Sequence, residues 1–252
     1  RDLHSFPTRR SSDLESRMDC VAVLSRGVIE VKEFRRLNGT AMPAEITLIG
    51  GASVLANYGF RDMTYDVDAM IRASSAMKEA INRVGDRLGL PAGWLNSDFT
   101  RTKSYTPKLA EYSVYYKTFS NVLTVRTISG EYLIAMKLMS SRQYKNDISD
   151  IVGILREQKE RGSPFTLQQI ETAVCNLYGG WDHFPKTAFP LIKEIMESGR
   201  LEELYRLYRE EEKNSKETLI EFEKDYPGVA KEDNIGEILK NLKARKQRDL
   251  DK

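Results

Sequence analysis

Short apolar runs and amphipathic periods alternate over the first 160 residues of the chain. Residues 46–49 and 66–71 are apolar runs of strand length. Residues 112–116 alternate between apolar and polar, and residues 122–128 are rich in β-branched side chains, so these patterns also predict strands. Small residues, or apolar residues repeated every three or four positions, predict helices over residues 28–37, 52–58, 76–88, 130–139 and 147–159.

Only helical patterns follow residues 161–164, which read Arg-Gly-Ser-Pro. Thr166 and Gln169 have the spacing of a capping box, and three further amphipathic helices are expected after that one. We therefore predict an α+β fold, with a small mixed sheet flanked by helices over residues 15–160. An all-helical C-terminal domain is predicted over residues 161–252.

The first fourteen residues show no apolar periodicity and are treated separately. Residues 1–14 (RDLHSFPTRRSSDL) resemble the conceptual translation of a sequencing-adapter oligonucleotide. We predict that they are an artefact and exclude them from the fold, as one excludes a fusion scar. His183 is then the one histidine left in the sequence. A catalytic scheme built on histidine is therefore not expected.

Composition narrows the class of protein further. The 252 residues are 40% hydrophobic, enough for a sizeable core, and 30% charged with a net charge of only +2. That balance indicates no dominant nucleic-acid or membrane surface. Cys20 and Cys175 lack the spacing of a disulfide framework or zinc site, and no apolar run is long enough to span a bilayer. We expect a cytoplasmic protein that does not bind membranes.

Two acids and two glycines carry the candidate chemistry. Asp66 and Asp68 are two positions apart in a predicted strand, so their carboxylates point to the same face. Such a pair suits Mg²⁺ (or Mn²⁺), which commonly takes one or two carboxylates together with substrate phosphates. Gly50 and Gly51 precede a predicted helix, where close backbone approach and unpaired N–H groups favour phosphate. The pattern fits in-line attack of a hydroxyl on a phosphorus atom.

These residues resemble a known superfamily. Gly50 and Gly51, fourteen residues, and then the triplet at 66–68 are similar to the glycine-rich and Asp-x-Asp signature of polymerase-beta-like nucleotidyltransferases. The match looks closest to a bacterial branch related to the abortive-infection toxins of type IV toxin–antitoxin systems. Support for that branch comes from YGFR at 58–61, EYLIAMKL at 131–138 and RQYKNDISDI at 142–151.

The resemblance implies an activity and assigns roles to residues. It implies a nucleotidyltransferase-like fold and transfer of a nucleoside monophosphate from an NTP to a hydroxyl on RNA or protein. Implied partners are the NTP, tRNA or other RNA, and a cognate antitoxin. The residues that it assigns are Asp66, Asp68 and Lys137 as catalytic, with Asp66 and Asp68 holding the metal, and Gly50, Gly51, Ser53, Arg61 and Asp147 as nucleotide-binding.

The sequence departs from the superfamily pattern in one respect. Active members usually carry a third acidic residue on a later strand, yet residues 122–128 contain Arg126 and no carboxylate. Glu111 or Glu131 are the candidate substitutes. Two readings therefore stay open: an active nucleotidyltransferase, or a catalytically inactive binding module of the same fold.

Several features also have purely structural readings. The two glycines serve a tight turn equally well. Lys137 with Asp147 and Asp150 would form an ion pair between consecutive helices. Arg61 either orients a phosphate or pairs with Asp62 or Asp66. Residues 91–107, with Trp94 and Phe99, are either a substrate-facing loop or a plain surface loop. A third possible function is interaction with a partner through the helical domain.

Overall fold

A computed structural model describes residue 36 and residues 44–61, 64, 67–73, 76–119, 121–142, 144–231 and 234–250. The helix predicted over 28–37 lies outside this set, except for Arg36, which is helical. Asp66 and residues 1–14 lie outside it as well.

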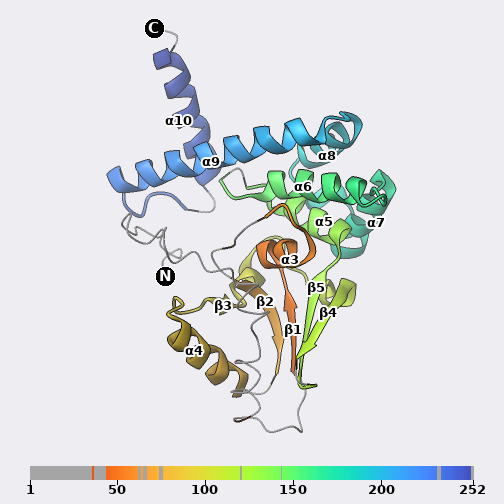
Figure 1. Cartoon of the computed structure of the whole chain (residues 1–252). Helices are drawn as coiled ribbons and strands as arrows, with labels where there is room; N and C mark the ends of the chain where they lie inside the picture. The colour runs from red at the N-terminus through yellow and green to blue at the C-terminus, as the bar shows by residue number, and fades with distance from the viewer. Residues whose placement is uncertain are drawn as a thin grey trace.

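A five-stranded mixed sheet forms the lower part of the molecule in Figure 1. Its order is β3-β2-β1-β5-β4. The central strand β1 pairs antiparallel with β2 and parallel with β5, and the outer pairs are β2·β3 parallel and β4·β5 antiparallel. The bounds are β1 Ala44–Leu48, β2 Val67–Arg72, β3 Leu95–Asn96, β4 Ser113–Phe119 and β5 Leu123–Ile128.

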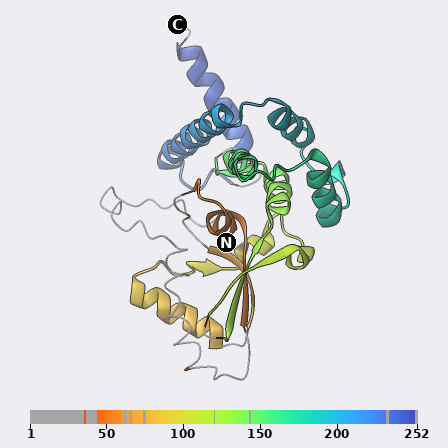
Figure 2. The ribbon, with the colours of Figure 1, turned by 45° about the vertical axis from the view of Figure 1, so that its right-hand side comes forward.

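Helices flank the sheet and make up the C-terminal region, as predicted. Their bounds are α3 Gly50–Asn57, α4 Ala76–Leu88, α5 Gly130–Ser140, α6 Asp147–Glu160, α7 Leu167–Tyr178, α8 Ala188–Glu197, α9 Leu201–Asp225 and α10 Ile235–Leu250. Short 3₁₀ helices lie at η2 Asp98–Arg101, η3 Pro107–Tyr112 and η4 Trp181–His183. Figures 1 and 2 show α5 to α9 gathered above one end of the sheet, with α3 between them and the strands. The capping box of Thr166 and Gln169 is present at the start of α7.

The two faces of the sheet differ in character. One face is apolar and is covered by α4, whose Met77, Ala80 and Val84 pack with Ile46 and Leu48 of β1. The other face carries polar side chains, because residues directly opposite one another in neighbouring strands point to the same side. This polar face includes Glu45, Thr47, Asp68, Arg72 and Arg126.

A continuous apolar core connects the sheet to the helical region. It begins at Ile49 and Ile128 at the ends of β1 and β5 and continues through α5 and α6 to Ile195 of α8. Helix α9 packs along α6, as both ribbon views show. Burial on this scale contributes most of the stabilisation of a domain. The predicted boundary near residue 160 therefore falls between segments that share one core, and the division into domains stays a prediction.

The segment over residues 91–107 is more ordered than predicted. Trp94 is 4% exposed and Phe99 is 6% exposed, so neither aromatic ring faces a substrate. The Trp94 indole donates a hydrogen bond to the carbonyl of Ile81 at 3.1 Å. The expectation of a substrate-facing loop is wrong for these two rings. The short strand β3, which pairs with β2, anchors this segment to the edge of the sheet.

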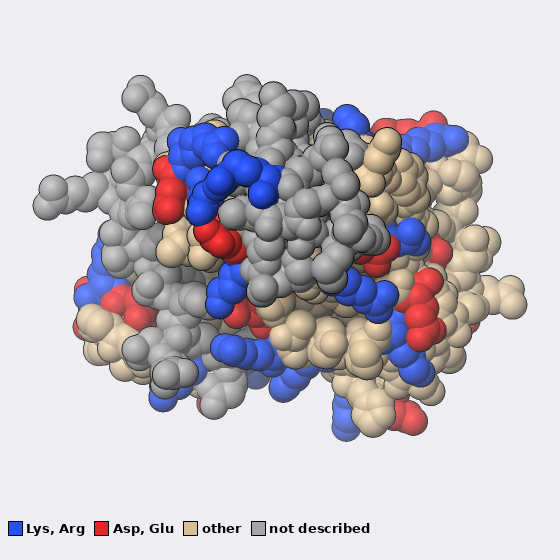
Figure 3. Space-filling model, turned by 90° about the horizontal axis from the view of Figure 1, so that it is seen from below, with Lys and Arg blue, Asp and Glu red and all other residues tan. Residues whose placement is uncertain are grey.

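One face of the molecule carries charges of both signs. On the face seen in Figure 3, Lys and Arg side chains are interspersed with Asp and Glu, and no broad area of one sign stands out among the described residues. No helix in the described part of the chain has the length and apolar character that crossing a bilayer requires.

Gly153 of α6 provides a test of the packing. A Cβ added there would lie 2.5 to 2.7 Å from three carbon atoms of the Phe60 ring. We predict that Gly153→Ala lowers the free energy of unfolding by roughly 1–3 kcal/mol, the usual cost of overpacking. Gly236→Ala in α10 is the control, because nothing lies within 4 Å of its added Cβ. Urea denaturation measures both, and a Gly153→Ala protein as stable as wild type contradicts this packing.

Candidate functional site

The turn between β1 and α3 places a carboxylate beside the start of a helix. Gly50 has φ +53°, a left-handed conformation that favours glycine. The N–H of Ile49 donates to the carbonyl of Asp68 at 2.8 Å. A Cβ added at Gly50 would lie 3.9 Å from Oδ2 of Asp68. The strand, glycine turn and helix predicted from the sequence are present, and the Asp68 carboxylate lies next to the first residue of α3. The second acid of the predicted pair, Asp66, is outside the described residues.

Gly51 allows an arginine to approach the backbone of α3. A Cβ at Gly51 would lie 2.8 Å from Nη2 of Arg61 and 3.0 Å from Nη1 and Cζ, closer than real Cβ atoms pack. The guanidinium of Arg61 therefore lies against the first turn of the helix. A cation and the unpaired N–H groups of a helix N-terminus both attract anions, so this turn has two sources of positive potential.

Five charged side chains form a network behind this turn, which we call the charge cluster. Its members are Arg61, Lys137, Arg142, Asp147 and Asp150. Oδ2 of Asp150 lies 2.5 Å from Nη1 of Arg61 and 2.7 Å from Nζ of Lys137. Lys137 also contacts Oδ1 of Asp147 at 3.3 Å, and Arg142 contacts Oδ2 of Asp147 at 2.9 Å. The side chains of Asp147 and Asp150 are only 3% and 2% exposed.

The charge cluster holds three cations and two carboxylates. Buried charges are costly unless they are paired, and each of the three cations contacts a carboxylate of the cluster. The ion pair between α5 and α6, one of the two readings open from the sequence, is therefore present for Lys137 with Asp147 and Asp150. Direct contact of Lys137 or Asp147 with a nucleotide stays a prediction.

Asp147 is held in its ionised form. Burial by itself raises the pKa of this carboxyl, but the charges of Lys137 and Arg142, together with hydrogen bonds from Arg142, lower the pKa well below its usual value. The backbone N–H of Arg142 donates to Asp147 at 3.2 Å, in addition to the side-chain contact. Asp147 therefore fixes the turn between α5 and α6 and stays negative at any ordinary pH.

The side chain of Ser53 is buried and contacts the backbone of Ile128. Its hydroxyl accepts from the N–H of Ile128 at 2.8 Å and lies 3.4 Å from the carbonyl of the same residue. The residue is 0% exposed. This contact joins α3 to the end of β5. The assignment of Ser53 to the phosphates stays a prediction.

Strand β5, on which active members of the superfamily usually carry a third acidic residue, carries Arg126. Arg126 of β5 is opposite Thr47 of β1, which is opposite Met70 of β2, so its side chain lies on the same face as Asp68. Arg126 donates to Oγ and to the carbonyl of Ser113, both at 2.7 Å. The described strand β5 contributes no carboxylate to this face.

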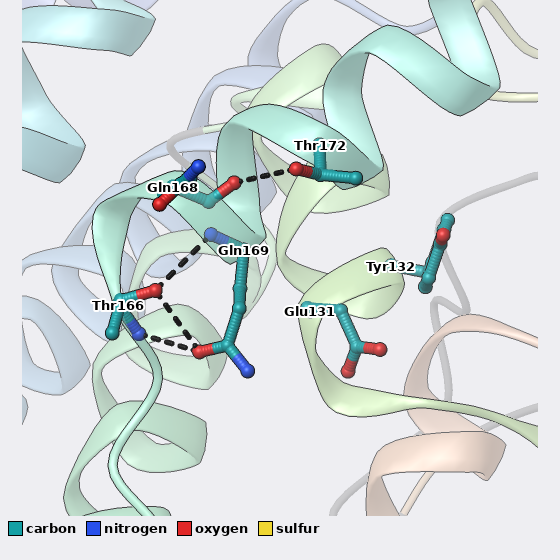
Figure 4. Close-up of a pocket in the computed structure, with 6 residues that line it drawn as sticks. All are labelled: Glu131, Tyr132, Thr166, Gln168, Gln169 and Thr172. Atoms are coloured by element: carbon teal, nitrogen blue, oxygen red, sulfur yellow. Dashed lines mark hydrogen bonds between the residues drawn. The ribbon is translucent and has the colours of Figure 1, made fainter.

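Glu131, one candidate substitute, lies on the helical side of the molecule. Figure 4 shows its carboxylate at a pocket between the first turns of α5 and α7, together with Thr166 and Gln169. Its Oε1 accepts from the hydroxyl of Ser129 at 3.1 Å. Glu111, the other candidate, is exposed in η3. Among the described residues, which exclude Asp66, no group of three His, Cys, Asp or Glu side chains is arranged to hold a metal ion.

The two aspartates therefore fit one divalent cation, whose remaining coordination positions would be filled by water and by phosphate oxygens of the substrate. Asp68 is the described carboxylate next to the α3 turn, and Asp66 is two residues earlier in the sequence. Mg²⁺ commonly binds through one or two carboxylates and completes its coordination with waters and phosphate oxygens. Asp66 and Asp68 are the residues that would hold the ion.

Sequence reasoning missed Glu212 of α9, which lies at the N-terminus of α6. Its Oε1 accepts from the N–H groups of Ile148 at 2.8 Å and Ser149 at 3.4 Å. Glu212 is 3% exposed. Burial, assisted by the nearby charge of Asp150, raises the pKa of Glu212 to about 7, although the hydrogen bonds partly oppose that rise. The sequence signal that could have found it is a glutamate among the positions of α9 that face the interior of the protein.

This raised pKa predicts how stability depends on pH. Between pH 4.5 and about 7 the unfolded Glu212 is ionised while the folded one keeps its proton. Glu212 therefore stabilises the fold most below pH 4.5, and this contribution falls as pH rises until pH reaches about 7. Glu212→Gln should remove this loss, so that the variant gains stability over wild type as pH rises through that range.

The measurement is urea denaturation of wild type and variant at several pH values. Glu211→Gln is the matched control, because Glu211 is the exposed neighbour on the same helix. A constant difference between Glu212→Gln and wild type from pH 4.5 to 8 contradicts the assignment.

Comparisons with known proteins agree with the geometry at the level of family. No curated protein and no solved structure matches the chain. One family model does match, over residues 28–156, and it is described as a nucleotidyltransferase of unknown function. The match includes the glycine turn, both aspartates and the charge cluster, and it covers just over half of the 252 residues. The chain therefore belongs to the DUF6036 family of nucleotidyltransferases.

Proposed function

We propose that the protein is a Mg²⁺-dependent enzyme that transfers a nucleoside monophosphate from an NTP to a hydroxyl acceptor. The observation that carries this proposal is the turn at the start of α3. There the Asp68 carboxylate lies beside Gly50 and the Arg61 guanidinium lies against Gly51. This turn thus offers a carboxylate that can bind a cation, and it offers helix N–H groups and a guanidinium that attract phosphate. A metal–triphosphate complex requires both kinds of group.

The chain's own residues supply the binding of the triphosphate. The first turn of α3 offers backbone N–H groups, and the glycines leave space for phosphate oxygens to approach them. Arg61 adds a guanidinium suited to bidentate contact with phosphate. Lys137 lies behind Arg61, shares Asp150 with it and adds positive charge to the site. Asp66 and Asp68 would hold Mg²⁺ or Mn²⁺.

When bound, the divalent ion stabilises the charge that develops on the attacking and leaving oxygens. The protein's part is to orient the NTP so that the acceptor hydroxyl is in line with the bond to the leaving pyrophosphate. The hydroxyl oxygen forms a bond to the α-phosphorus, pyrophosphate leaves with the electron pair, and the hydroxyl proton goes to solvent or to a carboxylate of the site.

The acceptor and the biological setting are finer proposals. The resemblance to abortive-infection toxins supports RNA, including tRNA, or a protein as the acceptor. It also supports a role in a toxin–antitoxin or phage-defence system with a cognate antitoxin. The face seen in Figure 3 carries mixed charge and does not by itself indicate an RNA-binding surface.

A second candidate function is a nucleotide-binding module without catalysis. Arg126 favours it, because a guanidinium on the same sheet face as Asp68 replaces the carboxylate expected on that strand. In that case the protein would bind metal–NTP and transfer nothing.

Asp68→Asn tests the enzyme proposal. We predict that purified wild-type protein with labelled NTPs, Mg²⁺ and total RNA or lysate transfers label, and that Asp68→Asn or Asp66→Ala lowers transfer at least about 100-fold. Asp86→Asn is the control, because Asp86 is exposed on α4. Transfer that is undiminished in Asp68→Asn rejects this mechanism. Absence of transfer by wild type, together with NTP binding in calorimetry, selects the binding module.

Gly51→Ala tests the phosphate site without removing a charge. The added Cβ displaces the Arg61 guanidinium from the first turn of α3. We predict that the Kd for Mg–NTP rises about tenfold in titration calorimetry, while Gly236→Ala binds as wild type does. Unchanged affinity in Gly51→Ala places the triphosphate away from this turn.

A further inference from the structure

Helix α9 lies outside the segment that the family model matches, yet it contacts two parts of the candidate site. Tyr205 and Glu212 are seven residues apart on this helix, so they project from the same side. Tyr205 contacts the segment that leads to Arg61, and Glu212 contacts the N-terminus of α6. The two contacts fall at two of the segments that supply the charge cluster: the residues after α3 and the first turn of α6.

Tyr205 holds the residue directly before Arg61. Its hydroxyl donates to the carbonyl of Phe60 at 3.1 Å. The two rings meet edge to face, with centroids 5.7 Å apart and an interplanar angle of 77°. The guanidinium of Arg156 in α6 lies 4.5 Å from the centre of the Tyr205 ring, and this cation–π contact also holds the tyrosine in place.

Helix α6 also contacts this segment. The N–H of Gly59 donates to both oxygens of Glu157, at 2.9 and 3.2 Å. The ring of Phe60 lies so close to Gly153 that no Cβ fits there. Residues 59–61 are therefore fixed between α6 and α9, and Arg61 leaves this segment toward Gly51 and Asp150.

We propose that Tyr205 is a positioning residue, whose hydroxyl fixes the Phe60 carbonyl and thereby directs the Arg61 guanidinium to the start of α3 for phosphate binding. This inference rests on the proposed function, because the phosphate is that of the bound NTP. A phenylalanine at position 205 would keep the ring contacts and the apolar burial. The hydroxyl therefore contributes orientation, in addition to the packing that the ring supplies.

The experiment compares Tyr205→Phe with Tyr208→Phe. Tyr208 is the matched control, because it lies one turn further along α9 and packs against the same apolar core. Titration calorimetry with each Mg–NTP gives the Kd. We expect Tyr205→Phe to weaken binding about three- to tenfold, the worth of one well-placed hydrogen bond, and Tyr208→Phe to leave it unchanged.

A double-mutant cycle with Arg61→Gln separates positioning from general stability. If Tyr205 acts through Arg61, Tyr205→Phe causes no further loss of affinity in the Arg61→Gln background. Losses that add in full, or an equal loss in Tyr208→Phe, overturn the proposal.

Failure of the proposed function gives a distinct result, namely a wild-type protein that binds no NTP. The positioning is then read from hydrogen exchange of the amides of residues 59–61. Faster exchange in Tyr205→Phe than in both wild type and Tyr208→Phe supports the role of the hydroxyl, and equal exchange in all three proteins overturns it.

Discussion

The candidate site depends on one carboxylate, that of Asp150. Its Oδ2 accepts a hydrogen bond from Arg61 and forms an ion pair with Lys137 at 2.7 Å, and the side chain is almost completely buried. The two cations come from different parts of the chain, the residues after α3 and helix α5, so a single oxygen of α6 joins three segments. Without this carboxylate, two adjacent positive charges would repel one another in a region with little water to screen them. The position of the Arg61 guanidinium beside Gly51 follows from this pairing.

The glycines of the site make these close approaches sterically possible. Gly51 leaves room for the guanidinium of Arg61, and Gly153 leaves room for the ring of Phe60. Each approach involves a neighbour so close that a Cβ would displace it. The glycine turn therefore has a packing role, in addition to the contact with the nucleotide that we propose.

Much of the fold was predictable because local patterns agree with the final packing. The strand, turn and helix around Gly50 follow from a short apolar run and two glycines, and the helical region follows from amphipathic periods. The charge cluster was predictable only in part. Lys137 and Asp147 followed from resemblance, whereas the contact of Arg61 with Asp150 depends on how α6 packs against α5 and against the segment after α3. Tyr205 contacts Phe60 across 145 residues of sequence and Glu212 contacts Ile148 across 64, and no local pattern specifies such partners.

Family membership and geometry together support a nucleotidyltransferase, and the site's account rests on where the triphosphate binds. The most direct measurement is a crystal structure of the protein with Mg²⁺ and a non-hydrolysable NTP analogue. We predict phosphate oxygens within hydrogen-bond distance of the backbone N–H groups at Gly50 and Gly51 and of the Arg61 guanidinium, with Mg²⁺ on Asp66 and Asp68. Phosphates bound elsewhere, for example at the pocket of Glu131, with the α3 turn in contact only with solvent, would contradict it.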